Sequence, residues 1–471
     1  MNRRKFVKNS AMLGAGFSLR KLPAFAGAGF PVVRVPAIQR NFSSKVIEDT
    51  ILNFKSGVKD QELGWLFGNC FPNTLDTTVT YSIKDGRPDT YVITGDIDAM
   101  WLRDSSAQVW PYLHFINQDK NLQQLIAGVI NRQAVCILRD PYANAFYNDP
   151  NKTGEWKNDV TDMKPGLHER KWEIDSLCYP IRLAHRYWQL TGDITPFDAH
   201  WVSAIKLTLK TFKEQQRKTN DGPYHFERNT AWATDGVAMN GYGYPVKPVG
   251  LICSAFRPSD DATIYSFLVP SNFFAVVSLR QAAEMMKKII GDAATAAELS
   301  ALAAEVEHAL KVHAVIEHSQ YGKIYAYEVN GYGSYNLMDD ANVPSLLGLP
   351  YLDVMSKTDP IYRNTRKMLL SLNNPFFFKG LAGEGIGGPH AGKDMIWPLG
   401  IIIRGLTSIN DEEIKYCIAM LKNSNAATGF MHESFNMNDA ANFTRKWFAW
   451  ANTLFGEFLW ETYQTRPHLL A

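Results

Sequence analysis

Residues 275–313 read AVVSLRQAAEMMKKIIGDAATAAELSALAAEVEHALKVH. After the break at Gly291-Asp292, the apolar residues Leu299, Leu302 and Val306 recur at steps of three and four, which predicts one buried helical face. The stretch before the break is also apolar and helical in period. Two helices joined by a short turn pack as an antiparallel pair, so this stretch favours an all-α fold built of helical hairpins.

Similar apolar periodicity dominates the chain from about residue 45 to its C-terminus. Alternating segments such as DTYVITGD and YGKIYAYEV predict short strands or hairpin arms between the helices. We find no repeat of fixed period, so the periodicity does not fix the number of helical pairs. We expect a toroid of helical hairpins with sizeable loops. Besides the hairpin, the helical segments are 105–117, 122–139, 174–192, 198–216, 340–348, 361–373, 394–407, 412–424 and 444–463.

The first residues differ from the rest of the chain. They read MNRRKFVKNSAMLGAGFSLRKLPAFAGAGF, with basic residues first, then a short apolar run, then an Ala-x-Ala motif at 24–26. This order is typical of a secretory signal, and Arg3-Arg4 resembles a twin-arginine export signal. We therefore predict an export signal over 1–26, an extended segment over 27–44 and a periplasmic mature protein. The alternative is a disordered basic tail.

The composition favours one large core and a neutral partner. The chain is 46% hydrophobic and 20% charged, and it has no evident linker, so we expect a single domain over 45–471. Residues 1–26 hold six Lys or Arg and no acid, so removing them changes the net charge from +2 to −4. A mildly acidic protein lacks the basic field that binds nucleic acid or an anionic membrane surface, so we expect neither partner and no membrane insertion.

The five cysteines, at 70, 136, 178, 253 and 417, form no CxxC pair and no Cys/His cluster at metal-ligand spacing. We therefore expect neither a zinc site nor another cofactor. Most of these cysteines are expected to be buried small apolar residues. The oligomeric state is not readable from the sequence.

The loops are rich in Trp, Tyr, Asp, Arg and Gly, a composition typical of carbohydrate sites. The segment GDIDAMWLRDSSAQVWPYL, residues 95–113, places Asp98, Trp101, Arg103 and Asp104 at the start of a helix. An arginine flanked by two aspartates suits the binding of hydroxyl groups. An ordinary helix cap with a salt bridge is the alternative interpretation.

Two further segments carry candidate acids. In FRPSDDATIYSFLVPSNFFA, residues 256–275, Asp260 and Asp261 follow Arg257, and the charge of one acid raises the pKa of its neighbour. A carboxyl kept protonated near neutral pH is what a general acid requires. In GFMHESF, residues 429–435, Glu433 follows His432 and could act as a general base. A favourable helix start and a solvated loop acid are the respective alternatives.

Two other loops complete the candidate site. EGIGGPHAGKDMIWPLGIIIRG, residues 384–405, is not a phosphate loop because no Lys-Ser/Thr follows its glycines. Its His390 and Trp397 are candidate sugar contacts. GLHERKWEIDSLCYPI, residues 166–181, has the charge density of a site mouth, although a solvated helix start explains it nearly as well.

DAMWLRDSSAQ, GLICSAFRPSDDA and GFMHESF with FTRKWFAWANTLFGE, taken together and in this order, resemble glycoside hydrolase family 125, the exo-acting α-1,6-mannosidases. The resemblance covers about residues 45 to 465. It implies an (α/α)6 barrel and metal-independent hydrolysis of α-mannosides with inversion. It also implies that the general acid is Asp260 or Asp261, of which we favour Asp260, and that the general base is Glu433.

For the terminal mannose, the resemblance implies binding by Arg103, Asp104, Asp98 and the second aspartate of the pair, with Trp101 and Trp397 shaping the pocket. Arg257, His390 and His432 complete the expected substrate contacts. Two alternatives remain open at this stage: another (α/α)6 glycosidase or a lyase, and a non-catalytic glycan-binding protein.

Overall fold

The computed structural model describes residues 29–470, so the expected export signal over 1–26 lies outside the described residues. Residues 33–471 form one compact unit. This unit begins earlier than residue 45, because Arg34 forms ion pairs with Glu48 at 2.5 Å and Asp76 at 2.6 Å. Arg34, within the segment predicted to be extended, is therefore in contact with the rest of the unit. No helix in the described part is long and apolar enough to cross a membrane.

The expected hairpin is present as α9 (Val269–Met285) and α10 (Ala293–His313), which pack on each other. Gly291 takes the left-handed conformation, with φ of 77°, after a π-helical turn over Met286–Ile290. The side chain of Asp292 then accepts a hydrogen bond from the backbone N–H of Thr295 and caps α10. The glycine and the aspartate therefore end one helix and begin the next.

Helices account for most of the regular structure, as predicted. Each expected helical segment except 340–348 contains a helix. The remaining helices are α2 (Lys45–Gly57), α3 (Gln61–Cys70), α4 (Asn73–Thr77), α5 (Leu102–Val109), α6 (Lys120–Arg139), α7 (Ile174–Thr191), α8 (Ala199–Gln215), α11 (Pro360–Leu369), α12 (Pro398–Leu406), α13 (Asp411–Asn423) and α14 (Ala449–Thr465).

The prediction of a helix over 340–348 is wrong, and the segment forms a series of turns instead. Pro344 lies in its middle, where it lacks a backbone N–H donor and would clash with a preceding helical turn. The carboxylate of Asp339 accepts hydrogen bonds from the backbone N–H groups of Leu346 and Leu347, both at 2.9 Å. A side chain thus satisfies donors that a helix would have paired internally.

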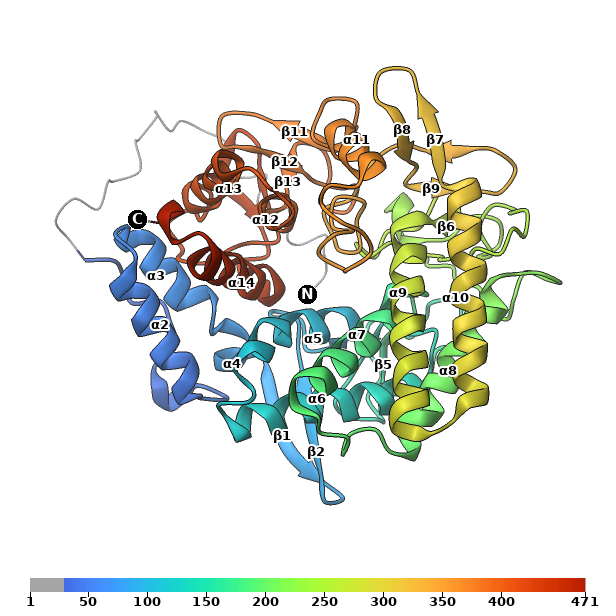
Figure 1. Cartoon of the computed structure of the whole chain (residues 1–471), viewed down its shortest axis with the longest axis horizontal. Helices are drawn as coiled ribbons and strands as arrows, with labels where there is room; N and C mark the ends of the chain where they lie inside the picture. Colours follow the sequence, from blue (N-terminus) through green and yellow to red (C-terminus); the bar gives the residue numbers. More distant parts are fainter. Residues whose placement is uncertain (1–28, 471) are drawn as a thin grey trace. The chain divides into compact units, whose positions relative to one another are not determined.

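The helices succeed one another around a common centre within the compact unit (Figure 1). Helices α5, α7 and α9 pack side by side, and α14 packs on both α5 and α12. Every residue of α5 is buried, whereas α10, which packs outside α9, exposes one face. Most of the buried apolar residues form one continuous core that extends from Ile47 to Leu470, and Ala99, Trp101 and Ala145 form a second, small cluster.

The strands form small antiparallel sheets at the ends of the helices, and both alternating segments of the sequence contain them. The sheets are β1 (Val79–Lys84) with β2 (Arg87–Val92); β3 (Met100–Trp101), β4 (Ala145–Phe146) and β5 (Leu167–Glu169); β6 (Phe267–Leu268), β9 (Glu328–Val329) and β10 (Tyr335–Asn336); β7 (Val315–His318) with β8 (Gly322–Tyr325); β11 (Phe377–Lys379) with β12 (Glu384–Ile386); and β13 (Met395–Ile396), β14 (Ser434–Asn436) and β15 (Asp439–Thr444).

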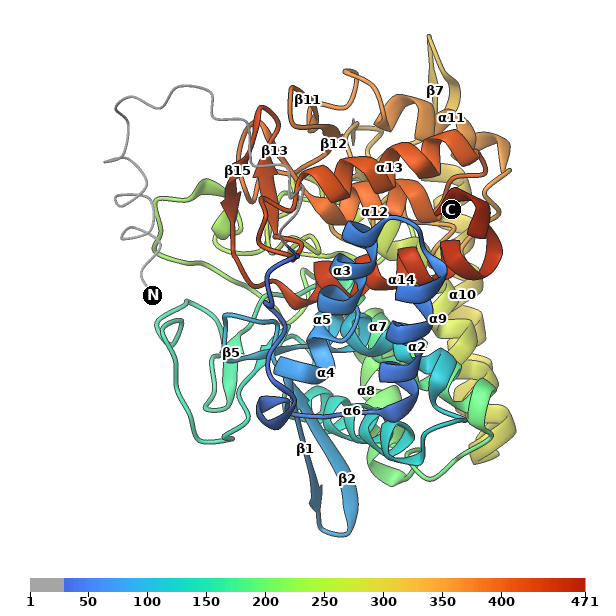
Figure 2. The same ribbon diagram turned by 90° about the vertical axis from the view of Figure 1, so that its left-hand side faces the viewer.

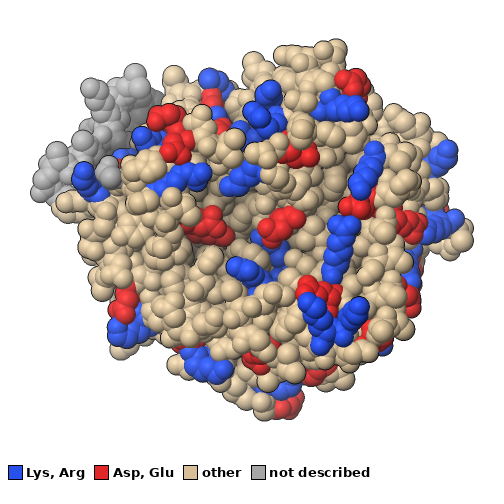
Figure 3. All heavy atoms as spheres, viewed as in Figure 1, with Lys and Arg blue, Asp and Glu red and all other residues tan. Residues whose placement is uncertain are grey.

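The surface charges and the cysteines agree with the composition. On the face drawn in Figure 3, lysine and arginine side chains are interspersed with aspartate and glutamate, as the totals of 49 basic and 47 acidic residues lead one to expect. All five cysteines are free and buried, which confirms that they act as small apolar residues.

Candidate active site

The candidate residues gather where several central helices begin. A short strand precedes each of α5, α7, α9, α12 and α14, and Figure 2 shows β5, β13 and β15 together on the left, with α12, α13 and α14 extending to the right. Arg103 and Asp104 lie in the first turn of α5, and Asp175 lies in the first turn of α7. Helix N-termini carry partial positive charge, so this end of the fold favours carboxylates.

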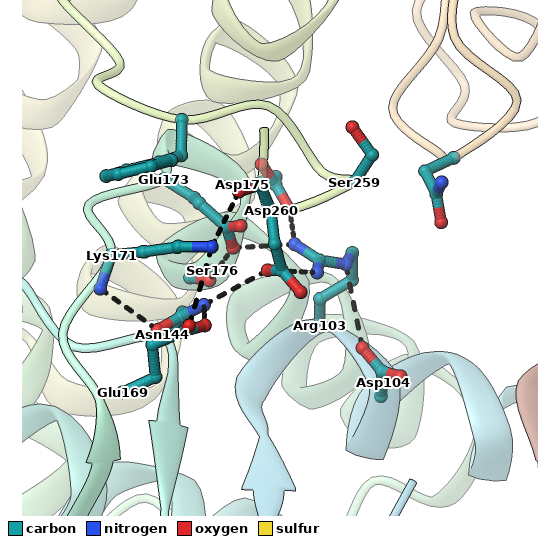
Figure 4. A network of polar contacts seen from close by, with 12 residues as sticks. Arg103, Asp104, Asn144, Glu169, Lys171, Glu173, Asp175, Ser176, Ser259 and Asp260 are labelled. Carbon is teal, nitrogen blue, oxygen red and sulfur yellow. Dashed lines mark hydrogen bonds and ion pairs between the residues drawn. The ribbon is translucent and has the colours of Figure 1, made fainter. Parts of the chain in front are cut away.

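Arg103 is the centre of a buried charge network (Figure 4). Its Nη1 lies 2.6 Å from Oε2 of Glu173 and 3.0 Å from Oδ2 of Asp175. Its Nη2 lies 3.5 Å from Oδ1 of Asp260, and its Nε lies 3.6 Å from Oδ2 of Asp104. One guanidinium therefore holds four carboxyl groups that come from three separate parts of the chain.

Asp260 is the partly accessible carboxyl of this network. Its side chain is 22% exposed, and its Oδ1 accepts a hydrogen bond from the amide of Asn144 at 3.2 Å. Its backbone has φ of 67°, which is uncommon for a residue with a side chain. The ammonium of Lys171 donates to the carbonyl oxygen of Asp260 at 2.7 Å and helps to hold this conformation. The carboxyl is thus presented in a fixed orientation.

Glu173 is a buried carboxyl next to Asp260. The two side chains are close enough to share a hydrogen bond, and the hydroxyl of Ser176 donates to Glu173 at 2.8 Å. Burial, and then the charges of Asp260 and Asp175, raise the pKa of Glu173 well above its usual range despite the opposing effect of Arg103. Glu173 therefore favours its protonated form more than an ordinary glutamate, and it shares a hydrogen bond with Asp260.

Asp261 has a different environment from Asp260. Its side chain is 2% exposed, lies 3.7 Å from Nδ1 of His390 and accepts a hydrogen bond from the hydroxyl of Ser259 at 3.3 Å. Burial alone would raise the pKa of Asp261, but the hydrogen bond and charge of His390 outweigh it and lower the pKa. Asp261 is consequently a fixed anion, whereas Asp260 faces accessible space.

Glu433 lies immediately before β14 and is held by two donors from the far end of β15. The hydroxyl of Thr444 donates to Oε2 of Glu433 at 3.0 Å, and Nη1 of Arg445 lies 3.4 Å from its Oε1. Arg445 also binds Asp96 at 2.5 Å. These contacts orient an acceptor carboxylate, which is the form a general base requires.

Arg445 connects the charges of the loop that carries Glu433 with those of the Arg103 network. Burial opposes its charge, but the carboxylates of Glu433, Asp96 and Asp104 raise its pKa. Asp104 in turn lies beside Arg103, and the charge of Asp260 contributes to raising the pKa of Asp104. Glu433 and Asp260, 173 positions apart in the chain, therefore belong to one electrostatic network.

Two predicted aromatic residues border this network. The ring of Trp101 packs edge-on against His168 at 5.0 Å, and that of Trp397 packs edge-on against His390 at 6.0 Å. Both indole N–H groups are buried and have no hydrogen-bond acceptor among the described residues. Since leaving such a donor unpaired costs about 1–3 kcal/mol, these groups are suited to donate to a ligand hydroxyl.

Three predicted substrate contacts lie elsewhere. Asp98 is 72% exposed and pairs with Lys152 at 2.9 Å rather than with Arg103. Arg257 is buried and donates to Glu328 at 2.7 Å, so it supports the loop of the two aspartates. His432 stacks on Phe443 with 3.7 Å between ring centroids, and burial lowers its pKa to about 4, so it supports the loop of Glu433 as a neutral ring.

Sequence reasoning missed Asn144 and Arg445 as members of the site. Arg445 lies within the FTRKW stretch, whose charge gives a weak signal, whereas Asn144 lies in a loop with no distinguishing pattern. Glu173 and Asp175 were noted only as charges at a possible site mouth. Within residues 29–470, no group of three or more His, Cys, Asp and Glu side chains is arranged to hold a metal ion.

The chain is similar to known proteins over most of its length. Residues 60–460 match the family model described as metal-independent α-mannosidase (GH125). A Schizosaccharomyces pombe protein, the meiotically up-regulated gene 157 protein, is 40% identical over 469 residues, covering 96% of this chain and 92% of the relative.

Solved structures show the same relationship. A Streptococcus pneumoniae metal-independent α-mannosidase, in a non-productive complex with α-1,6-mannobiose, is 40% identical, with a TM-score of 0.87 over 90% of this chain and 100% of that chain. A glucoamylase from Saccharomycopsis fibuligera is 13% identical, with a TM-score of 0.51 over 92% of this chain and 98% of that chain, and it shares the fold alone.

Proposed function

The chain belongs to the metal-independent α-mannosidases of glycoside hydrolase family 125, and we propose that it removes single mannose units from the non-reducing ends of α-1,6-linked mannosides with inversion. It is a glycoside hydrolase by this membership. The observation that carries the finer assignment is the electrostatic network that joins Asp260 to Glu433 through Arg103, Asp104 and Arg445. We propose that the architecture on which the site is built is an (α/α)6 barrel.

Asp260 is the general acid in this proposal. It is more accessible than Asp261, and its neighbour Glu173 has a raised pKa and shares a hydrogen bond with it. Asp260 donates a proton to the glycosidic oxygen as the bond from this oxygen to the anomeric carbon breaks. After the products leave, solvent returns a proton to Asp260, which shares a hydrogen bond with Glu173.

Glu433 is the general base. It removes a proton from a water molecule whose oxygen forms the new bond to the anomeric carbon, on the face opposite to the departing oxygen. An inverting pair requires room for this water, so the carboxyl groups of Asp260 and Glu433 are expected to stand about 6.5–9.5 Å apart. The products are mannose of inverted configuration and the shortened glycan.

The remaining residues of the site bind and orient the terminal mannose. Asp104 and the fixed anion Asp261 accept hydrogen bonds from sugar hydroxyls, while Trp101 and Trp397 donate from their indole N–H groups. Arg103 keeps the carboxyl groups in place and limits their mutual repulsion. The preference for the α-1,6 linkage is supported by the mannobiose bound to the Streptococcus pneumoniae protein.

The proposal is tested by replacing the general base. In Glu433→Gln, release of mannose from α-1,6-mannobiose should fall by about 10²–10⁴-fold, while affinity for the disaccharide, measured by calorimetry, is retained. Asp439→Asn, on the exposed part of the same sheet, is the matched control and should keep full activity. Undiminished release by Glu433→Gln would reject the base and favour a non-catalytic role for this carboxylate.

The linkage is tested with a panel of α-1,2-, α-1,3- and α-1,6-linked mannobiose. We expect release of mannose from the α-1,6 isomer at the highest kcat/KM. Equal rates on all three would reject the linkage assignment and leave the α-mannosidase assignment intact.

We also propose that the mature protein is exported to the periplasm, since residues 1–26 have the layout of an export signal. Fractionation of a bacterial host that carries the full chain should recover the shortened protein in the periplasm. Retention of the full-length chain in the cytoplasm would contradict this assignment.

A further inference from the structure

A cavity of about 400 Å³ lies outside the Arg103 network. One wall comes from the base of the β1–β2 hairpin, where Thr80 is exposed, and another from the loop that follows β4, with Asn148 and Lys152. Asp98 also lines the cavity. The cavity has the size of a small-ligand site, which is typically about 300–1,000 Å³.

The chemistry of the lining suits a neutral polyhydroxylated ligand. The walls offer threonine hydroxyls, the amides of Asn41 and Asn148, two carboxylates and the ammonium of Lys152. Asp98 and Asp149 outnumber the one cationic lining residue, so the cavity is not suited to a phosphate or another multiply charged anion. Hydroxyls, amides and single charges that alternate around a hollow are the groups that bind sugar hydroxyls in both donor and acceptor roles.

Two segments connect this cavity to the catalytic groups. Asp98 is two residues from Asp96, which binds Arg445 beside Glu433, and two residues of extended chain span at most about 7 Å. Asn148 is four residues from Asn144, which binds Asp260, and four residues span at most about 14 Å. The cavity therefore lies within a few sugar units of both carboxyl groups.

We propose that this cavity is an accessory sugar-binding site, which takes a neutral pyranoside unit of a mannose-containing glycan beyond the unit that is removed. The inference rests on the proposed function for the identity of the sugar. The predicted contact Asp98 then touches the glycan at this second site rather than at the terminal mannose. The ligand could be the far end of the chain being cut or a separate glycan chain, and the two sources are separated below.

Filling the cavity tests the proposal. In Thr80→Trp, a large side chain replaces an exposed threonine on its wall, and Thr219→Trp, at an exposed position outside the cavity lining, is the matched control. The readout is the ratio of kcat/KM for linear α-1,6-mannotetraose to kcat/KM for α-1,6-mannobiose. This ratio should fall about fivefold in Thr80→Trp, as expected from one lost hydrogen bond, through a higher KM for the longer substrate, and should not change in the control.

A second variant and a binding measurement complete the test. Lys152→Met removes the ammonium and its pair with Asp98, and it should lower the same ratio even if Thr80→Trp fails to fold. Calorimetry with mannotetraose is carried out on Glu433→Gln protein with and without Thr80→Trp. If one equivalent of mannotetraose binds and Thr80→Trp weakens its affinity, the cavity binds the far end of the substrate.

Binding of two equivalents of mannotetraose, with one of them lost in Thr80→Trp, would identify a separate glycan chain as the ligand, provided that the ratio of kcat/KM values does not change. An unchanged ratio in both variants, with one equivalent bound at unchanged affinity, overturns the accessory site. Hydrolysis of mannobiose by the wild-type protein is scored separately. A failure of the accessory site is therefore distinguishable from a failure of the proposed function.

Discussion

Two clusters of buried arginine and carboxyl groups lie along α7 and differ in what surrounds them. At its start, Asp175 binds Arg103 in the candidate active site. About 10 Å further along the helix axis, Arg182 lies between the rings of Trp110 and Tyr351, at 3.5 and 4.9 Å from their centroids. Each cluster contains carboxyl groups whose pKa burial raises.

The second cluster combines Arg182 of α7 and Glu457 of α14 with Tyr351, which lies in a turn. Glu457, in the middle of α14, is buried, and the hydroxyl of Tyr351 donates to it at 2.9 Å. The first cluster is assembled from loops and helix starts, and it includes the partly exposed Asp260 with its left-handed backbone. A raised carboxyl pKa therefore does not identify the catalytic region, whereas access to solvent and convergence of several loops do.

The largest expected effect that separates the two clusters follows from Asp260→Asn. Hydrolysis of α-1,6-mannobiose should fall by about 10²–10⁴-fold, because the departing oxygen no longer receives a proton. An aryl α-mannoside with an activated leaving group should be affected much less, since its departure needs little protonation. Asp261→Asn should slow the hydrolysis of both substrates by a similar factor. If Asp261→Asn spared the aryl mannoside and Asp260→Asn did not, the roles of the two aspartates would be exchanged.

A smaller effect is expected from Glu173→Gln. The amide preserves the size of the side chain but removes the proton that Glu173 shares with Asp260, so kcat/KM for mannobiose should fall by about tenfold. The pH profile of kcat/KM should also change in shape, because the variant lacks the buried carboxyl of raised pKa beside Asp260. A uniform loss at every pH would mean that Glu173 is only structural.

The smallest effect on catalysis is expected from Glu457→Gln in the second cluster. Burial and the charge of Glu461 raise the pKa of Glu457 from 4.5 to about 8. Between these values the folded state keeps a proton that the unfolded chain releases, so the free energy of unfolding falls as pH rises.

Removing this group should reduce the loss of stability between pH 5 and pH 8 by on the order of 3 kcal/mol, measured by urea unfolding at both pH values. Activity on mannobiose should be unchanged. A loss of turnover comparable to that of Glu173→Gln would erase the distinction between the clusters.

The sequence predicts the helices better than it predicts the contacts of the site. The hairpin over 275–313 is local, since its glycine, cap and periodicity determine it without the rest of the chain. The turns over 340–348 depend instead on Asp339 and Pro344, which override an apolar pattern. Asp98 and Arg103 are five residues apart in one charged segment, yet only the structure separates them, because Asp98 lies before the short strand β3 and Arg103 lies in α5, and the two side chains have different partners.

Asn144 and Arg445 illustrate the same limit. Asn144 contributes through Asp260, which is more than one hundred positions away, and Arg445 contributes through Glu433, which is about ten positions away. Neither residue lies in a local pattern that predicts its role. Asp260, Asp261 and Glu433 were candidates from their own segments, and the resemblance to a family implied their roles. Their pairing across the site depends on packing that no single segment encodes.

The account depends most on a single-displacement reaction between the carboxyl groups of Asp260 and Glu433. The direct test is the configuration of the mannose released in the first turnovers from α-1,6-mannobiose, followed by proton NMR before mutarotation equilibrates the anomers. The account predicts β-mannose as the first product. Initial release of α-mannose would contradict it, because retention requires a covalent intermediate and two carboxyl groups only about 5–5.5 Å apart.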